Sequence, residues 1–98
     1  MYQSKIKSEE TDRLFEAILA LRDTEECYRF FEDLCTFSEI RAMAQRLQVA
    51  QMLQKGDTFV QISEQTGVSS ATITRVNKCI SYGSEGYKLV LDRLGEKK

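Results

Sequence analysis

The segment from Phe59 to Val76, FVQISEQTGVSSATITRV, constrains the fold more than any other part of the chain. Its apolar residues recur at helical spacing on both sides of a Thr66-Gly67-Val68 turn. Gly67 is suited to the left-handed conformation that ends a helix, because glycine has no Cβ to clash. The pattern predicts two short helices joined by a tight turn, which is a helix-turn-helix over about residues 58–79.

The second helix of this motif is predicted to run from Ser69 to about Ile80, with Ser69 or Ser70 as its cap. A helix-turn-helix places this helix in the major groove of DNA. Ile73 and Val76 should face the core. Hydroxyls can bond base edges or phosphates, and alanine or threonine methyl groups can contact the thymine methyl. The predicted DNA-binding residues are therefore Ser69, Ser70, Ala71, Thr72, Thr74 and Arg75.

The rest of the chain predicts four more helices and no strand. Proline is absent and glycine is 5 of 98 residues, which suits a helical domain. The apolar spacing and the cap and stop residues place these helices over about residues 9–21, 24–34, 37–55 and 87–94, with a polar tail from Gly95. The apolar face predicted for the long third helix consists of Ile40, Met43, Ala44, Leu47, Ala50 and Leu53.

The absence of histidine limits the chemistry of the chain. Without an imidazole there is no general base for work near neutral pH and no histidine to hold a transition metal. The three cysteines, Cys27, Cys35 and Cys79, form no CxxC pair, and we interpret them as reduced thiols packed like small apolar residues. We therefore predict neither an enzyme nor a metal site.

Charge is distributed unevenly although the net charge is −1. Residues 8–33 carry three basic and nine acidic side chains, whereas residues 34–81 carry five basic and three acidic ones. Double-stranded DNA is therefore expected to meet the second half of the chain. No segment is apolar over the length needed to span a membrane, and the N-terminus lacks the apolar core of a signal peptide. We expect a cytoplasmic protein without a membrane partner.

Several large apolar residues exceed what a chain of 98 residues easily buries. They could complete an ordinary core, or they could be shared between two copies. A homodimer is the favoured interpretation, because small helical domains often need oligomerisation to complete a core. Two-fold symmetry also suits a helix-turn-helix that reads a palindrome. The residues concerned are Phe15, Tyr28, Phe30, Phe31 and Tyr87.

Between Thr36 and Cys79 the chain resembles the Trp repressor superfamily. The resemblance implies an all-α, six-helix, intertwined homodimer with one domain over residues 1–98. The matching features are the Thr36 and Glu39 cap, a long helix with Arg46 at mid-length, Lys55-Gly56 at its end, and the run Ala71-Thr72-Ile73-Thr74-Arg75.

In this superfamily tryptophan binds between the core and the DNA-reading helices. The resemblance assigns a ligand or anion site to Thr36, Arg46 and Arg75. Val76 stands where the family has a glycine that leaves room for the indole, and a β-branched side chain should fill part of that space. Cys79 replaces a serine that receives the amino group, and a thiol is a poor hydrogen-bond partner. We therefore predict no response to tryptophan and leave open a different small-molecule corepressor.

The leading hypothesis is a sequence-specific, dimeric transcription regulator that acts as a repressor. It predicts DNA affinity that falls steeply with salt. One alternative is a helical protein-interaction module that docks a partner through its acidic helices, for which binding would not respond to salt. A second alternative is the DNA-binding head of a replication or transposition protein, although the chain supplies no catalytic domain for that role.

Overall fold

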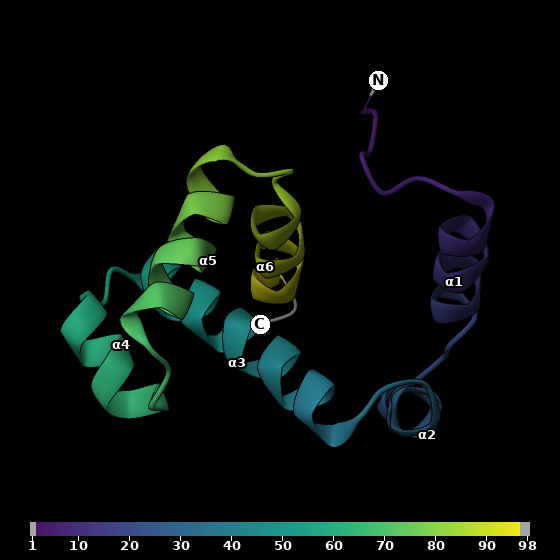
Figure 1. Cartoon of the computed structure of the whole chain (residues 1–98), viewed down its shortest axis with the longest axis horizontal. Coiled ribbons are helices and arrows are strands. Elements are labelled where there is room, and N and C mark those ends of the chain that lie inside the picture. The colour runs from purple at the N-terminus through teal and green to yellow at the C-terminus, as the bar shows by residue number, and fades with distance from the viewer. Residues whose placement is uncertain (1, 97–98) are drawn as a thin grey trace. The chain divides into compact units, whose positions relative to one another are not determined.

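The computed structural model describes residues 2–96 and contains six α-helices but no strand within them (Figure 1). The predicted all-α, six-helix fold is thereby confirmed. The helices are α1 (Glu9–Leu19), α2 (Thr24–Leu34), α3 (Phe37–Lys55), α4 (Phe59–Thr66), α5 (Ser70–Tyr82) and α6 (Gly86–Glu96).

The chain divides into two compact units, residues 1–37 and 38–98. The first unit holds α1 and α2, and the second holds α4, α5, α6 and nearly all of α3. The prediction of a single domain over residues 1–98 stays a prediction.

Local caps fix the two helices of the first unit. The Ser8 hydroxyl accepts a hydrogen bond from the Thr11 backbone N–H at 3.0 Å, and the Asp23 carboxylate accepts one from Glu26 at 2.9 Å. Each cap satisfies a backbone donor that the helix leaves unpaired. Extending the first helix to Leu21 was wrong. It ends at Leu19 with Ala20 as its C-cap, and the short link to the extended Asp23 cap of α2 is not helical.

The first unit exposes much of its apolar surface. Neither α1 nor α2 contains a fully buried residue. Phe30 and Phe31 make an edge-to-face contact with 5.6 Å between ring centroids. By contrast, Leu19 is 83% exposed and Tyr28 is 65% exposed. Since 11-residue helices have little stability of their own in water, α1 and α2 depend on further packing.

The second unit has a small core to which all four of its helices contribute. Helix α5 contributes two buried residues, Ile73 and Val76, and it contacts both α4 and α6. The core residues are Val49, Ala50, Met52, Ile62, Val68, Ile73, Val76 and Leu91. This cluster confirms the inward assignment of Ile73 and Val76 and fixes the position of α5 in the second unit.

Part of the apolar face predicted for α3 was wrong. Val49 and Met52 are buried, whereas Met43 and Ala44 are exposed. The core closes over the C-terminal half of the helix, and it selects the residues that face α4, α5 and α6 there. Helical periodicity alone does not specify which face meets these neighbours.

Two further expectations need correction. The predicted tail from Gly95 is helical as far as Glu96, because nothing in the last turn of α6 ends the helix earlier; Lys97 and Lys98 lie outside the described residues. The cysteines are free thiols, but Cys27 and Cys79 are exposed on helix surfaces, so they are not packed as small apolar residues.

Candidate functional site

The helix-turn-helix is built from short-range hydrogen bonds. Thr58 and Gln61 form a capping box at the start of α4, in which each side chain accepts a bond from the other residue's backbone N–H. Gly67 ends that helix in the left-handed conformation, with φ of 75°. This geometry confirms the predicted turn.

Two hydroxyls tie the turn back onto α4. Thr66 donates to the Ile62 carbonyl at 2.7 Å and accepts from the Val68 N–H at 3.2 Å. Ser63 donates to the Val68 carbonyl at 3.3 Å. Val68 is buried at the end of this network, so the turn is anchored in the core while α5 begins at the surface.

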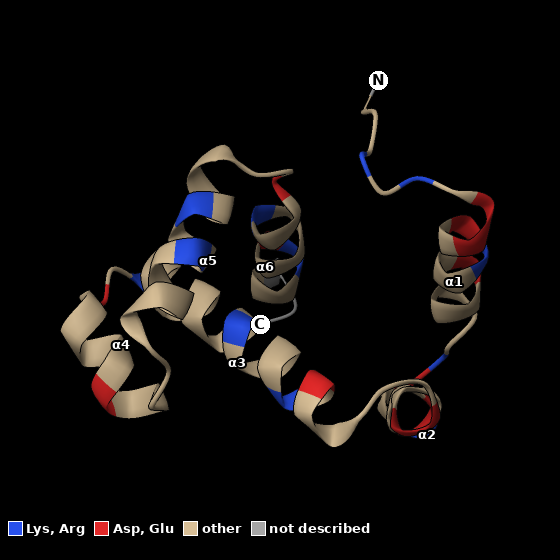
Figure 2. Cartoon of the chain, in the orientation of Figure 1, with Lys and Arg blue, Asp and Glu red and all other residues tan. Residues whose placement is uncertain are grey.

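The outer surface of α5 carries most of the predicted DNA-binding residues. Ile73 and Val76 are buried, which turns the opposite side of the helix toward solvent. This helix contains two basic residues and no acidic one (Figure 2). The exposed residues among those predicted to bind DNA are Ser69, Ser70, Ala71, Thr74 and Arg75.

Thr72 lies differently from the other predicted contacts. It is half-buried, and its hydroxyl lies 3.2 Å from the Ser69 hydroxyl, while its backbone N–H donates to the same Ser69 oxygen. Ser69 is thereby the N-cap of α5. The Thr72 side chain lines a cavity beside the helix, so its environment is the cavity and not the outer surface.

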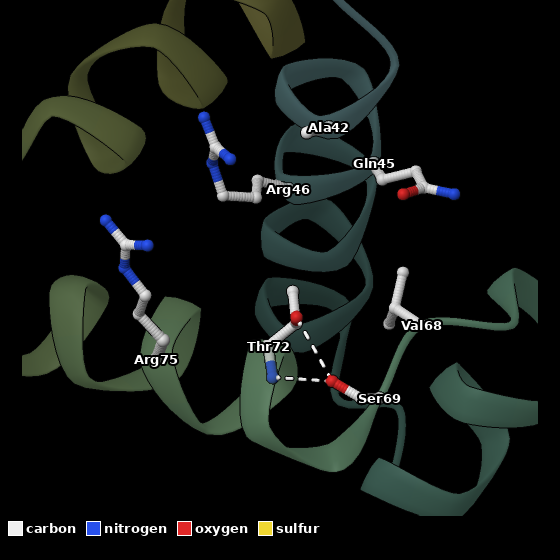
Figure 3. Close-up of a pocket in the computed structure, with 7 residues that line it drawn as sticks. All are labelled: Ala42, Gln45, Arg46, Val68, Ser69, Thr72 and Arg75. Carbon is white, nitrogen blue, oxygen red and sulfur yellow. Dashed lines mark hydrogen bonds between the residues drawn. The ribbon is translucent and has the colours of Figure 1, made fainter. Parts of the chain in front are cut away.

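This cavity lies between α3 and the start of α5 and has a volume of about 240 Å³. Figure 3 shows Arg46 of α3 and Arg75 of α5 extending on the same side of the site. Among the residues that the structure describes, neither guanidinium has an ion-pair or hydrogen-bond partner. The lining residues are Ala42, Gln45, Arg46, Val68, Ser69, Thr72 and Arg75.

Two of the three residues predicted to hold a ligand, Arg46 and Arg75, share the cavity. Thr36 belongs to the first unit, and its assignment to the ligand site stays a prediction. Val76 is buried in the core and Cys79 is exposed, and neither lines the cavity.

Sequence reasoning did not identify Ala42 and Gln45 as cavity residues. Ala42 precedes Arg46 by one helical turn and lines the same cavity, as the spacing of residues on one helix face allows. Gln45 directly precedes Arg46 in the sequence, and only the packed structure shows that Gln45 also lines the cavity.

The fold and the helix-turn-helix agree with a known family. The family model described as Trp repressor protein matches residues 9–95, which is most of the chain. The chain belongs to the Trp repressor family. The Trp repressor family is a family of helix-turn-helix regulators and not a family of enzymes.

Related proteins match this Trp repressor family member over nearly their full length. The uncharacterised protein YerC of Bacillus subtilis (strain 168) is 52% identical over 96 residues, which covers 98% of this chain and 92% of YerC. The crystal structure of a TrpR-like protein from Eubacterium eligens ATCC 27750 has a TM-score of 0.89 and 49% identity, covering 93% of this chain and 94% of that one. A crystal structure from Staphylococcus aureus gives a TM-score of 0.89 at 46% identity, covering 93% and 91%.

The described part of the chain contains neither a membrane-spanning helix nor a cluster of metal-binding side chains. No helix there is long and apolar enough to cross a membrane. No group of three or more cysteine or acidic side chains within residues 2–96 is arranged to hold a metal ion.

Proposed function

We propose that this chain is a sequence-specific DNA-binding transcription regulator that acts as a dimeric repressor. The observation that carries the proposal is the outer surface of α5, which is exposed and free of acidic residues. The opposite face of the helix is buried in the core through Ile73 and Val76. A helix-turn-helix presents this outer surface to the major groove. Family membership supports the same role.

Thr74 is the proposed base contact that is easiest to isolate. Its side chain is exposed, although the preceding residue, Ile73, is buried. A substitution of Thr74 should therefore leave the packing of the core unchanged. In Thr74→Ala we expect the affinity for a selected operator to fall by about tenfold, because a lost base contact costs about 1–3 kcal/mol. Thr74→Ser keeps the hydroxyl and should show whether the hydroxyl or the methyl group contributes.

Selection of genomic DNA fragments with the purified wild-type protein gives the operator for this comparison. Enrichment of a palindrome would support both the reading helix and the dimer. Binding of wild type and Thr74→Ala to every duplex with equal affinity would contradict sequence-specific recognition. A protein that binds no duplex, or binds a protein partner without any salt dependence, would indicate an interaction module instead.

The homodimer rests on apolar surface that a single chain leaves uncovered. No residue of α1 or α2 is buried. In the second unit α6 also exposes apolar side chains, since Leu89 is 51% exposed and Val90 is 46% exposed. Burial of such side chains is worth about 1.5–3 kcal/mol each, so a second copy that covers them gains stability.

The arginine-lined cavity is the proposed ligand site of the regulator. Arg46 and Arg75 are like charges without a partner among the described residues, and an anion between them would relieve their repulsion. Guanidinium groups bind carboxylates through paired hydrogen bonds. The proposed ligand is a small carboxylate. We propose that it is not tryptophan on the basis of the family resemblance alone, in which Val76 and Cys79 replace the residues next to the indole and the amino group.

Calorimetry tests the proposal that tryptophan is not the ligand. Titration with L-tryptophan should give no micromolar binding, and micromolar binding would show that Val76 and Cys79 do not prevent it. To test whether another small carboxylate binds in the cavity, thermal unfolding can be followed with a panel of free amino acids and 2-oxo acids. At least one should stabilise the wild type and leave Arg46→Gln unchanged, whereas a panel without effect would count against the carboxylate site.

A further inference from the structure

Lys78 lies on the outer surface of α5, beside residues already proposed to contact DNA. At about 100° per residue, Lys78 is about 20° around the helix from Ala71 and about 40° from Thr74. It is about 160° from Val76, which is 1% exposed, so the stripe formed by Ala71, Thr74 and Lys78 faces directly away from the core. All three side chains are exposed.

The two basic residues of α5 have different surroundings. Arg75 extends beside Arg46 at the cavity with α3 (Figure 3). Lys78 does not line that cavity. It also has no ion-pair partner among the described residues, and α5 itself contains no acidic side chain that could neutralise it. Lys78 is therefore the cation that α5 leaves available on its outward stripe.

The distance along α5 from Ala71 to Lys78 is close to the width of a DNA major groove. Seven residues separate Ala71 from Lys78, a rise of about 10 Å, and the major groove is about 12 Å wide. A reading helix inserts its N-terminal residues toward the base edges. Its later turns then lie near the sugar-phosphate wall. The N-terminal part of the stripe offers small and hydroxyl side chains for bases, and Lys78 offers a charge without sequence information.

We propose that Lys78 contacts a DNA phosphate and holds α5 in register while the residues before it read the bases. This assignment rests on the proposed DNA-binding function and adds a specific contact to it. Phosphate contacts of this kind fix the orientation of a protein on the duplex and make its affinity depend on salt. Sequence preference should be nearly independent of Lys78.

Three variants test the contact. Lys78→Gln removes the charge, Lys78→Arg keeps it, and Lys88→Gln removes an exposed charge from α6 as a matched control. The dissociation constants for the selected operator and for a scrambled duplex are measured by fluorescence anisotropy between about 50 and 200 mM salt. Circular dichroism melts confirm that each variant is folded.

The expected change is specific to Lys78→Gln. Its plot of log affinity against log salt should lose about 0.9 from the magnitude of the slope, with an affinity loss on the order of fivefold to tenfold near 0.1 M salt. The affinity ratio between operator and scrambled duplex should stay the same. Lys78→Arg and Lys88→Gln should keep the slope of the wild type.

Other results would overturn the assignment in distinguishable ways. An unchanged slope in Lys78→Gln, with normal operator binding by the wild type, would reject the phosphate contact and leave the proposed function intact. A changed operator-to-scrambled ratio with an unchanged slope would make Lys78 a base contact instead. If the wild type binds neither duplex, the proposed function fails, and the Lys78 contact fails with it.

Discussion

Ile73 and Thr74 are neighbours in the sequence but have opposite environments in α5. Ile73 is fully buried in the core of the second unit, whereas Thr74 is exposed on the outward stripe. One residue along a helix corresponds to a rotation of about 100°, which is enough to separate the two environments. Some positions of α5 therefore pack in the core, and the others are exposed and available to bind DNA.

This division predicts separate effects on stability. Ile73→Ala should lower the free energy of unfolding by about 2–5 kcal/mol, because it removes buried methyl groups and leaves a cavity. Thr74→Ala should change that free energy by less than about 0.5 kcal/mol. Urea denaturation followed by circular dichroism measures both. Equal destabilisation by the two variants would show that α5 is not packed by the face described.

At the scale of elements, three features coincide at the start of α5. Ser69 is the N-cap of the helix, and it also lies at the exposed end proposed to meet DNA. The same serine lines the arginine cavity. Cap, reading end and cavity wall therefore coincide at one helix terminus, so a ligand in the cavity would lie next to the groups proposed to read bases.

Substitutions of Ser69 can separate the cap from the reading end. Ser69→Ala should cost about 1 kcal/mol of stability, because the Thr72 N–H loses its acceptor. Ser69→Asp keeps a good cap and should leave stability within about 0.5 kcal/mol of wild type. Its negative charge should nevertheless weaken operator binding by repelling phosphates. Full operator affinity in Ser69→Asp would place the helix start away from the DNA backbone.

At the scale of the whole molecule, the exposed apolar side chains of α1 indicate how the protein assembles. The apolar stripe of this helix includes Leu19, which is 83% exposed, while the exposed Ala17 is about 160° around the helix from Leu19. Soluble proteins rarely leave such stripes open to water. We expect the purified protein to have twice the chain mass of 11.3 kDa and to melt at a higher temperature as its concentration rises.

A matched pair of charge insertions tests this assembly. Leu19→Glu should weaken the dimer by about tenfold or more, because an apolar side chain worth about 1.5–3 kcal/mol is replaced by a charge. Ala17→Glu adds the same charge outside the stripe and should leave the dimer intact. Analytical ultracentrifugation over a range of concentrations measures both. A wild type that stays monomeric, with a melting temperature independent of concentration, would contradict the dimer.

Much of the site was predictable because its backbone geometry is local. The Gly67 turn and the caps of α4 and α5 depend on hydrogen bonds that span three or four residues, so short sequence patterns predict that they occur there. The pattern left Ser69 and Ser70 as alternatives for the cap of α5, and the structure selects Ser69. The inward positions of Ile73 and Val76 follow from helical spacing within one element.

The amino-acid sequence by itself determined the six helices, the tight turn and the buried side of α5, because all of these follow from local bonding and periodicity. Tertiary structure decided which part of α3 is covered, that Thr72 faces a cavity, and that Ala42 and Gln45 line the same cavity. Those features depend on how α3 packs with α4, α5 and α6 in the core of the second unit. The packing is set by interdigitation of side chains from distant parts of the chain, which no local pattern specifies.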